Sequence, residues 1–281
     1  MADEAKSVLE IIDKQTTAKL LTDLVNISSP TGEEAAIAKY LADRFESVGL
    51  KTTLQEADQD RFNAVGVLEG DGSGLSLMFN GHMDTSYSGR EPWLRHVPGF
   101  QPSAFVEDGR LYGLGISNMK GALACYVEAL RALDDAGVRL RGDVLVAAVC
   151  GEIEKTQHGD AVGAEYRGYA AGTRYLVSHG GVADMCILGE PTEQKLVLAH
   201  FGTLWLRLST SGPFIHTAFS SGRLEENSIV RMRAVLDRVL AWLPEWEEEM
   251  SYGDLRGVAN VGAIQGGFGW RASRTPHRTD L

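Results

Sequence analysis

Leu75–Thr85, with the sequence LSLMFNGHMDT, is the stretch that decides the fold of this chain. Its first half is apolar, and such a run is typical of a buried strand. His82 and Asp84 follow at the carboxyl end of that strand, where open α/β sheets place their ligands. A neutral imidazole can bind a metal, and a carboxylate two residues on can orient the ring. The pair alone is more often a polar strand end without a ligand, so other stretches have to decide.

Three more acidic residues follow two further apolar runs. The runs at 143–150 and 185–188 predict buried strands, and Glu152, Glu154 and Glu190 come directly after them. A single carboxylate at a strand end is usually just solvated. Several carboxylates and a histidine at one sheet edge are costly unless a cation neutralises them.

Asn118 adds a polar side chain at the start of a predicted helix that follows the glycine-rich stretch 109–121. Asparagine is also a common helix cap, so this stretch alone is ambiguous. Together with the strand ends, it favours a metal site over a solvated edge. A mixture of imidazole and carboxylate ligands suits zinc, cobalt or manganese better than calcium.

The order of predicted elements indicates an α/β fold up to about residue 190. Residues 28–32, SSPTG, break a helical pattern, and Thr31 with Glu34 has the spacing of a capping box. From about residue 200 the pattern changes to that of a second region. The expected helices cover 8–27, 172–179 and 225–243, with one more that Gly49 ends and another that follows the stretch 109–121. The expected strands cover 50–56, 62–69, 143–150, 185–188, 204–210 and 260–264, besides the one within 75–85.

Composition excludes several classes of protein. The 281 residues include 44% apolar ones, enough for a substantial core, and the net charge is −11. That charge argues against nucleic acid or an anionic membrane as a partner. The acidic, amphipathic N-terminus has no signal-peptide core, and Cys125, Cys150 and Cys186 are widely spaced. We therefore expect three reduced core thiols in a cytoplasmic protein.

Five short motifs occur in the order seen in one family of metallopeptidases. They are PTGEE at 30–34, GHMDT at 81–85, GRLYGLGISNMKG at 109–121, GEIE at 151–154 and GEPT at 189–192. With them the chain resembles the acetylornithine deacetylase, succinyl-diaminopimelate desuccinylase and carboxypeptidase G family. The resemblance implies a zinc-peptidase-like α/β catalytic domain over 1–198, with a mixed sheet between helices. It also implies the first part of an inserted α/β lid or dimerisation domain over 199–281.

The resemblance further implies a pair of metals, usually zinc, held by residues of these motifs. His82 and Glu190 match ligands of one metal, and Asp84 matches the residue that holds His82. Asn118 occupies the position that bridges both metals, and Glu154 is a candidate ligand of the second.

Two catalytic side chains are implied in the same way. Glu152 matches the general base that takes a proton from water. His216, in the segment GPFIHT, matches a lid histidine that reaches an active site across a homodimer and polarises the scissile carbonyl. The expected substrate is an N-acyl amino acid or a small peptide, hydrolysed at its amide bond.

The sequence departs from the family pattern in three places. The bridging position is Asn118 instead of an aspartate, so it brings no charge to the second metal. Ile153 separates two glutamates that are adjacent in the family. Either a bulge restores the family geometry, or Glu154 or His158 takes the ligand role. The family's last histidine ligand has no counterpart before Leu281, so we expect either a fragment of a longer protein or an unusually short member. The rival hypothesis is therefore a catalytically impaired fragment or pseudoenzyme that acts as a dimeric binding or structural protein.

Overall fold

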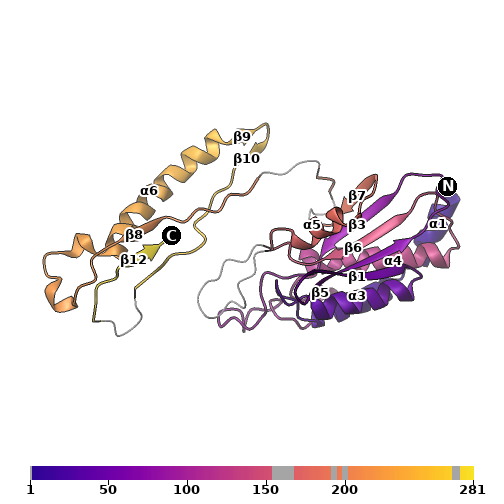
Figure 1. Cartoon of the computed structure of the whole chain (residues 1–281), viewed down its shortest axis with the longest axis horizontal. Coiled ribbons are helices and arrows are strands. Elements are labelled where there is room, and N and C mark those ends of the chain that lie inside the picture. The colour runs from indigo at the N-terminus through magenta and orange to yellow at the C-terminus, as the bar shows by residue number, and fades with distance from the viewer. Residues whose placement is uncertain (1, 154–167, 191–194, 198–201, 268–272) are drawn as a thin grey trace. The chain divides into compact units, whose positions relative to one another are not determined.

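The computed structural model describes residues 2–153, 168–190, 195–197, 202–267 and 273–281. The chain divides into two compact units, Met1–Leu196 and Val197–Leu281. The first unit is built around a five-stranded sheet with helices on both faces (Figure 1). The predicted mixed α/β architecture is confirmed.

The sheet of the first unit has the strand order β1-β2-β6-β3-β7. β1 pairs antiparallel with β2, and β2 with β6, whereas β6, β3 and β7 run parallel. The carboxyl ends of three strands therefore meet at one edge. The strands are β1 (Lys51–Asp58), β2 (Arg61–Leu68), β3 (Leu77–His82), β6 (Val144–Val149) and β7 (Met185–Leu188).

Alternation along β6 divides the core between two faces of the sheet. Val144, Val146 and Ala148 join the larger cluster with α2, α3 and α4, while Ala147 and Val149 join a smaller cluster with α5. Both faces are apolar because a central strand is covered on both sides. The helices of this unit are α1 (Ala2–Ile11), α2 (Lys14–Asn26), α3 (Ala35–Ser47), α4 (Gly121–Asp135) and α5 (Ala171–Ser178).

The N-terminal helical pattern forms two helices instead of the single one expected. Asp13 lies between them and accepts N–H hydrogen bonds from Gln15 and Thr16, so it caps α2. The predicted capping box at Thr31 and Glu34 is also wrong. Glu34 occupies the N-cap of α3 but makes no side-chain cap bond, because both side chains are engaged elsewhere.

Two predictions of burial are wrong at the edge of the sheet. The apolar run of β7 predicts a buried strand, but Met185 is 50% and Leu188 58% exposed, because among the described residues β7 pairs only with β3. Cys150 is buried as expected, whereas Cys125 and Cys186 are exposed.

Between β3 and α4 the chain forms a hairpin and a tight turn. The hairpin consists of β4 (Phe105–Glu107) and β5 (Arg110–Tyr112). A short π-helical turn, η1 (Ile116–Lys120), then leads directly into α4. Lys120 is buried, and its ammonium donates to the main-chain oxygens of Leu24 and Ile27 at 2.9 Å each, which fastens this turn to the end of α2.

The second unit is a three-stranded sheet with one long helix, α6 (Ser228–Glu249). Met232 is fully buried on α6, but Ile229 and Leu240 are about half exposed, so the expected apolar face is only partly covered. Of the strand expected over 204–210, only the last two residues lie in one, β8 (Ser209–Ser211), and residues 260–264, also expected as a strand, have no regular structure. The remaining elements are β8 (Ser209–Ser211), η3 (Thr217–Phe219), η4 (Leu224–Glu226), β9 (Ser251–Tyr252), β10 (Leu255–Arg256), β11 (Gln265–Gly266) and β12 (Arg278–Asp280).

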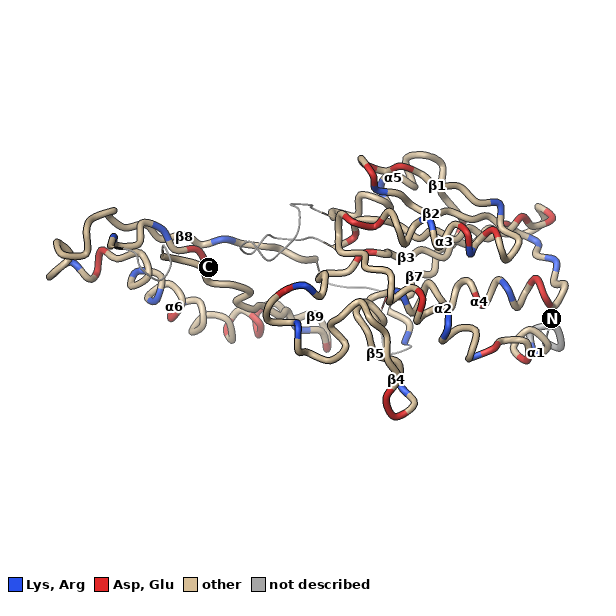
Figure 2. The backbone as a smooth tube through the Cα atoms, turned by 90° about the horizontal axis from the view of Figure 1, so that it is seen from below, with Lys and Arg blue, Asp and Glu red and all other residues tan. Residues whose placement is uncertain are grey.

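Charged residues of both signs are distributed over the described parts of the chain (Figure 2). In the described parts, basic residues are interspersed with acidic ones along the chain (Figure 2). Within the same residues, no helix combines the length and apolar character that crossing a bilayer requires.

Candidate metal centre

Strand register brings the predicted site residues to one level of the sheet. His82 pairs with Val149 in the parallel β3–β6 ladder, so Glu152 follows only three residues beyond that pair. On the other side Asn80 pairs with Leu188, and two residues further along both strands lie His82 and Glu190. The three side chains therefore converge because three parallel strands end together.

His82 occupies the centre of this group and is almost fully buried. Its Nδ1 donates to the main-chain oxygen of Asp84 at 2.9 Å and lies 3.4 Å from Asp84 Oδ1. Nε2 lies 3.7 Å from both Glu152 Oε2 and Glu190 Oε2. These distances are too long for hydrogen bonds, and Nε2 has no hydrogen-bond partner among the described residues.

The electrostatics of His82 favour a cation at Nε2. Burial lowers the pKa of His82, but Asp84, Glu190 and Glu152 outweigh burial and raise this pKa to about 10. A proton is one way to neutralise such a group of carboxylates, and a metal ion is another. Because Nδ1 is committed as a donor, the neutral ring presents its Nε2 lone pair to the space between the two glutamates.

Asp84 connects the histidine to the segment that carries Glu152. Its buried carboxylate accepts the main-chain N–H of Glu152 at 3.1 Å and of Ile153 at 3.0 Å. It also accepts the Thr31 hydroxyl at 2.9 Å. Burial raises the pKa of Asp84, but His82 and the main-chain N–H groups of Ile153 and Glu152 outweigh burial, so the net shift is downward. Sequence reasoning missed the role of Thr31, because its spacing to Glu34 suggested a local cap.

Glu152 and Glu190 are the accessible members of the group, with side chains 51% and 35% exposed. Burial, together with Glu190 and Asp84, raises the pKa of Glu152, although His82 opposes the shift. Glu190 follows Gly189, where an added Cβ would lie 2.5 Å from the Tyr126 hydroxyl oxygen. This close packing against α4 fixes the main chain just before Glu190.

Asn118 is exposed on η1, in the turn that passes the end of β3. Met119 packs so closely on Gly81 that an added Cβ there would lie 2.7 Å from its Cε, which places this turn beside His82. Glu154 and His158 lie outside the described residues. Within the described ranges, no three His, Cys, Asp or Glu side chains form a ready-made ligand set.

The residues present nevertheless fit part of a metal site. Two ligands bound to one zinc at 2.0–2.1 Å in a tetrahedral site lie about 3.4 Å apart. Nε2 of His82 and the Glu190 carboxylate, 3.7 Å apart, are close to that separation. The buried Nε2, which has no partner in the described part of the chain, is the observation that supports this fit.

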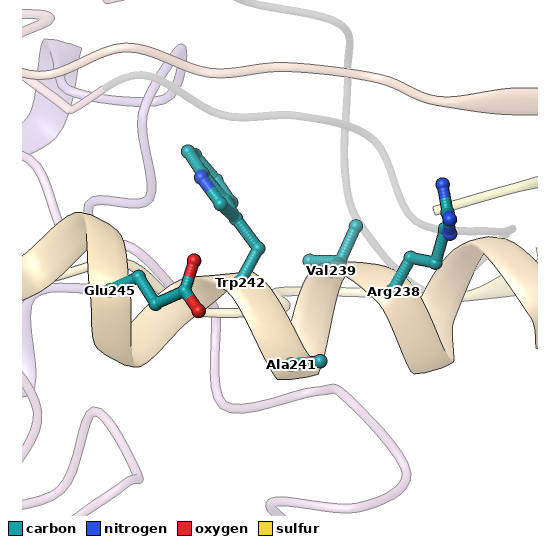
Figure 3. A pocket seen from close by; sticks show the side chains of 5 residues that line it. All are labelled: Arg238, Val239, Ala241, Trp242 and Glu245. Carbon is teal, nitrogen blue, oxygen red and sulfur yellow. The ribbon is translucent and has the colours of Figure 1, made fainter.

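His216 belongs to the second unit and is exposed. Its Nδ1 accepts the main-chain N–H of Ala218 at 3.2 Å, so in the neutral ring Nε2 carries the proton. A shallow hollow of the same unit lies along α6 and is lined by Trp242 with Arg238 and Glu245 (Figure 3). Among the described residues, its lining contains one carboxylate and no histidine or cysteine, so it does not resemble a metal site.

Comparison with known families decides the affiliation of the chain. The model of peptidase family M20/M25/M40 matches residues 78–260, which include every motif from His82 to the second unit. The chain belongs to this family. The family is one of metal-dependent hydrolases, so the resemblance drawn from the motifs is confirmed.

Relatives of this M20 chain include succinyl-diaminopimelate desuccinylases. The enzyme named so in Alkalilimnicola ehrlichii is 30% identical over 241 residues, 83% of this chain and 58% of that protein. A probable succinyl-diaminopimelate desuccinylase of Staphylococcus aureus (strain Mu50) is 29% identical over 202 residues, 71% of this chain and 46% of that protein. The chain thus spans about half the length of the curated relatives that it matches.

Solved structures share the fold at low sequence identity. A di-peptidase from Saccharomyces cerevisiae superposes with a TM-score of 0.64 at 12% identity, covering 100% of this chain and 71% of that one. An M20 family metallo-carboxypeptidase from Sulfolobus solfataricus gives 0.57 at 14% identity, covering 95% and 70%. At such identities the likeness establishes the fold alone.

Proposed function

We propose that this chain carries the metal site of an amidohydrolase that cleaves an N-acyl amino acid or a small peptide. One observation carries the proposal: the buried Nε2 of His82, without a partner among the described residues, lies 3.7 Å from both Glu152 and Glu190. The names of the desuccinylase relatives support an acyl amino acid as the substrate class.

The proposed ligands are His82 and Glu190 for one ion, zinc before cobalt or manganese, with Asn118 and Glu154 as candidates toward a second. A bound ion of this kind would polarise the scissile carbonyl and lower the pKa of a bound water. Asp84 keeps the His82 ring in the tautomer that offers Nε2.

Glu152 is the proposed general base. Its carboxylate is half exposed, so it can reach a water at the edge of the site, while its main-chain N–H is held by Asp84. After taking the proton from water, it can deliver that proton to the leaving amine. His216, with its proton on Nε2, is the proposed donor to the developing oxyanion, contributed by a second copy in a homodimer.

A second candidate function is a metal-poor or inactive binding protein of the same fold. Asn118 favours it, because an amide at the proposed bridging position brings no negative charge for a second ion. A cytoplasmic location stays a prediction under either function.

Substitution at Glu152 distinguishes these candidates. We expect Glu152→Gln to retain bound zinc and to lower kcat on N-succinyl or N-acetyl amino acids by about 10²–10⁴-fold, because only the base is lost. Zinc is measured by elemental analysis after dialysis, and hydrolysis by release of the free amine. Glu190→Ala is expected to lose the zinc as well.

Glu69→Gln is the matched control, since the Glu69 side chain is 70% exposed and lies in the same unit. Full activity in Glu152→Gln would remove Glu152 from the proposed role. A parent chain that binds zinc but hydrolyses none of these substrates would favour the binding protein instead.

A further inference from the structure

The segment that carries Glu152 is held by side chains from three separate parts of the chain. Each main-chain N–H of residues 150–153 donates to a buried side chain. In chain order the acceptors are Asn63 Oδ1 at 3.1 Å, Glu34 Oε1 at 3.1 Å, Asp84 Oδ1 at 3.1 Å and Asp84 Oδ2 at 3.0 Å. The Glu152 side chain is half exposed, so its direction depends on how firmly this main chain is fixed.

Glu34 is the member of this set that the proposed chemistry does not otherwise use. It is fully buried, and its carboxylate pairs with the buried guanidinium of Arg61. Arg61 Nη2 donates to Oε1 at 2.6 Å and Nε to Oε2 at 3.0 Å. This two-point contact fixes the orientation of the carboxylate that accepts the Gly151 N–H.

Stability alone is a weak reason for burying this pair. Removing two charges from water costs free energy that their attraction only partly repays, and apolar replacements are often as stable. The pair also packs closely against the segment that carries Glu152. Gly151 has φ 64°, and a Cβ there would lie 2.4 Å from Arg61 Nη2, so the guanidinium occupies the space beside this residue.

We propose that Glu34, oriented by Arg61, is a positioning residue that aims Glu152 by holding the Gly151 N–H. This role rests on the proposed function of Glu152 as the base. Glu34 holds the N–H of Gly151, and Asp84 holds the N–H groups of Glu152 and Ile153, so two carboxylates on separate segments fix three successive peptides around Glu152.

The double variant E34M/R61M tests the role without leaving an unpaired buried charge. Its side chains are apolar and of similar length, so the variant is expected to fold, while Gly151 loses its acceptor. We expect hydrogen exchange at the Gly151 amide to become faster by about tenfold or more. We also expect kcat to fall by about ten- to hundredfold, as for other residues that orient a catalytic group, with KM unchanged.

The surface pair of Glu33 and Arg90 provides the matched control. Glu33 directly precedes Glu34, and Arg90 Nη2 lies 3.2 Å from Glu33 Oε1. The side chain of Glu33 is 46% exposed and that of Arg90 is 68% exposed. E33M/R90M is expected to keep the exchange rate and kcat of the parent chain. Amides of β3 serve as the internal reference for exchange.

Several outcomes would overturn the proposal. If the Gly151 amide of E34M/R61M exchanges as slowly as in the parent chain, Glu34 does not hold the segment. If the variant has the kcat of the parent chain, holding the segment does not aim Glu152. A parent chain without hydrolase activity would refute the proposed function separately, and the exchange comparison would then still decide whether Glu34 holds the segment. If E34M/R61M does not fold, E34Q replaces it, with the same two readouts and smaller expected changes.

Discussion

At the scale of single residues, the charge state of His82 connects the fold to metal binding. Its Nδ1 is committed to Asp84, and its Nε2 faces two glutamates without a hydrogen bond to either. Because Asp84, Glu190 and Glu152 outweigh burial and raise the pKa of His82 to about 10, a proton occupies Nε2 at neutral pH when no metal is bound. Metal binding at this atom therefore has to displace a proton that the fold itself stabilises.

This charge predicts how the stability of the metal-free chain depends on pH. The pKa of His82 is raised from 6.5 to about 10, so its stabilising contribution is complete below 6.5 and is lost as pH rises through 10. We expect His82→Gln, compared with the parent chain in chelator, to remove an alkaline loss of roughly 2–4 kcal/mol. Urea unfolding followed by far-UV circular dichroism at several pH values between these limits measures the difference.

The contribution of Lys120 has to be separated from this effect. Burial lowers the pKa of Lys120 to about 7, which makes stability rise over the same range, and this contribution is common to variant and parent. His179, exposed and stacked on Tyr175, provides the control variant His179→Gln. An equal alkaline loss in His82→Gln and the parent would contradict the raised pKa.

At the scale of elements, the sequence predicted the sheet better than the contacts around its edge. Apolar runs located β3 and β6, and parallel register then required His82, Glu152 and Glu190 to meet. The partners of Thr31 and Glu34 could not be predicted, because each bonds a residue distant in sequence although their spacing matches a local cap. The prediction that β7 is buried failed for a similar reason, because an apolar run does not show whether its strand lies at the edge of a sheet.

Lys120 connects two elements, η1 and the end of α2, and the loss of this connection can be tested by one substitution. Its ammonium satisfies two main-chain oxygens at the end of α2 and fastens η1, which carries Asn118. We expect Lys120→Met to lower the free energy of unfolding by about 1–3 kcal/mol, because both carbonyl groups lose their buried donor. Urea unfolding measures it, with Lys39→Met, exposed on α3, as the control. Equal stability of the two variants would mean that water replaces the ammonium without cost.

At the scale of the whole molecule, the second unit presents apolar side chains that its own fold does not cover. Leu204 is 80%, Trp205 68% and Leu206 75% exposed, in a stretch without regular structure. Such a run of exposed apolar residues is typical of an interaction surface. It supports the proposed homodimer through 199–281, in which His216 of one copy serves the other.

The exposed run of Leu204, Trp205 and Leu206 predicts that the chain forms dimers. We expect the chain to self-associate and Leu206→Glu to raise the dissociation constant by about tenfold or more, because a leucine buried at the interface contributes roughly 1.5–3 kcal/mol. Sedimentation equilibrium over a wide range of protein concentration measures this constant. Leu9→Glu is the control, because this substitution adds the same charge at a leucine that is 68% exposed on α1 in the first unit. If both variants associate as the parent does, another surface joins the copies. If the parent stays monomeric, His216 has no second site to serve, and the oxyanion donor has to come from elsewhere.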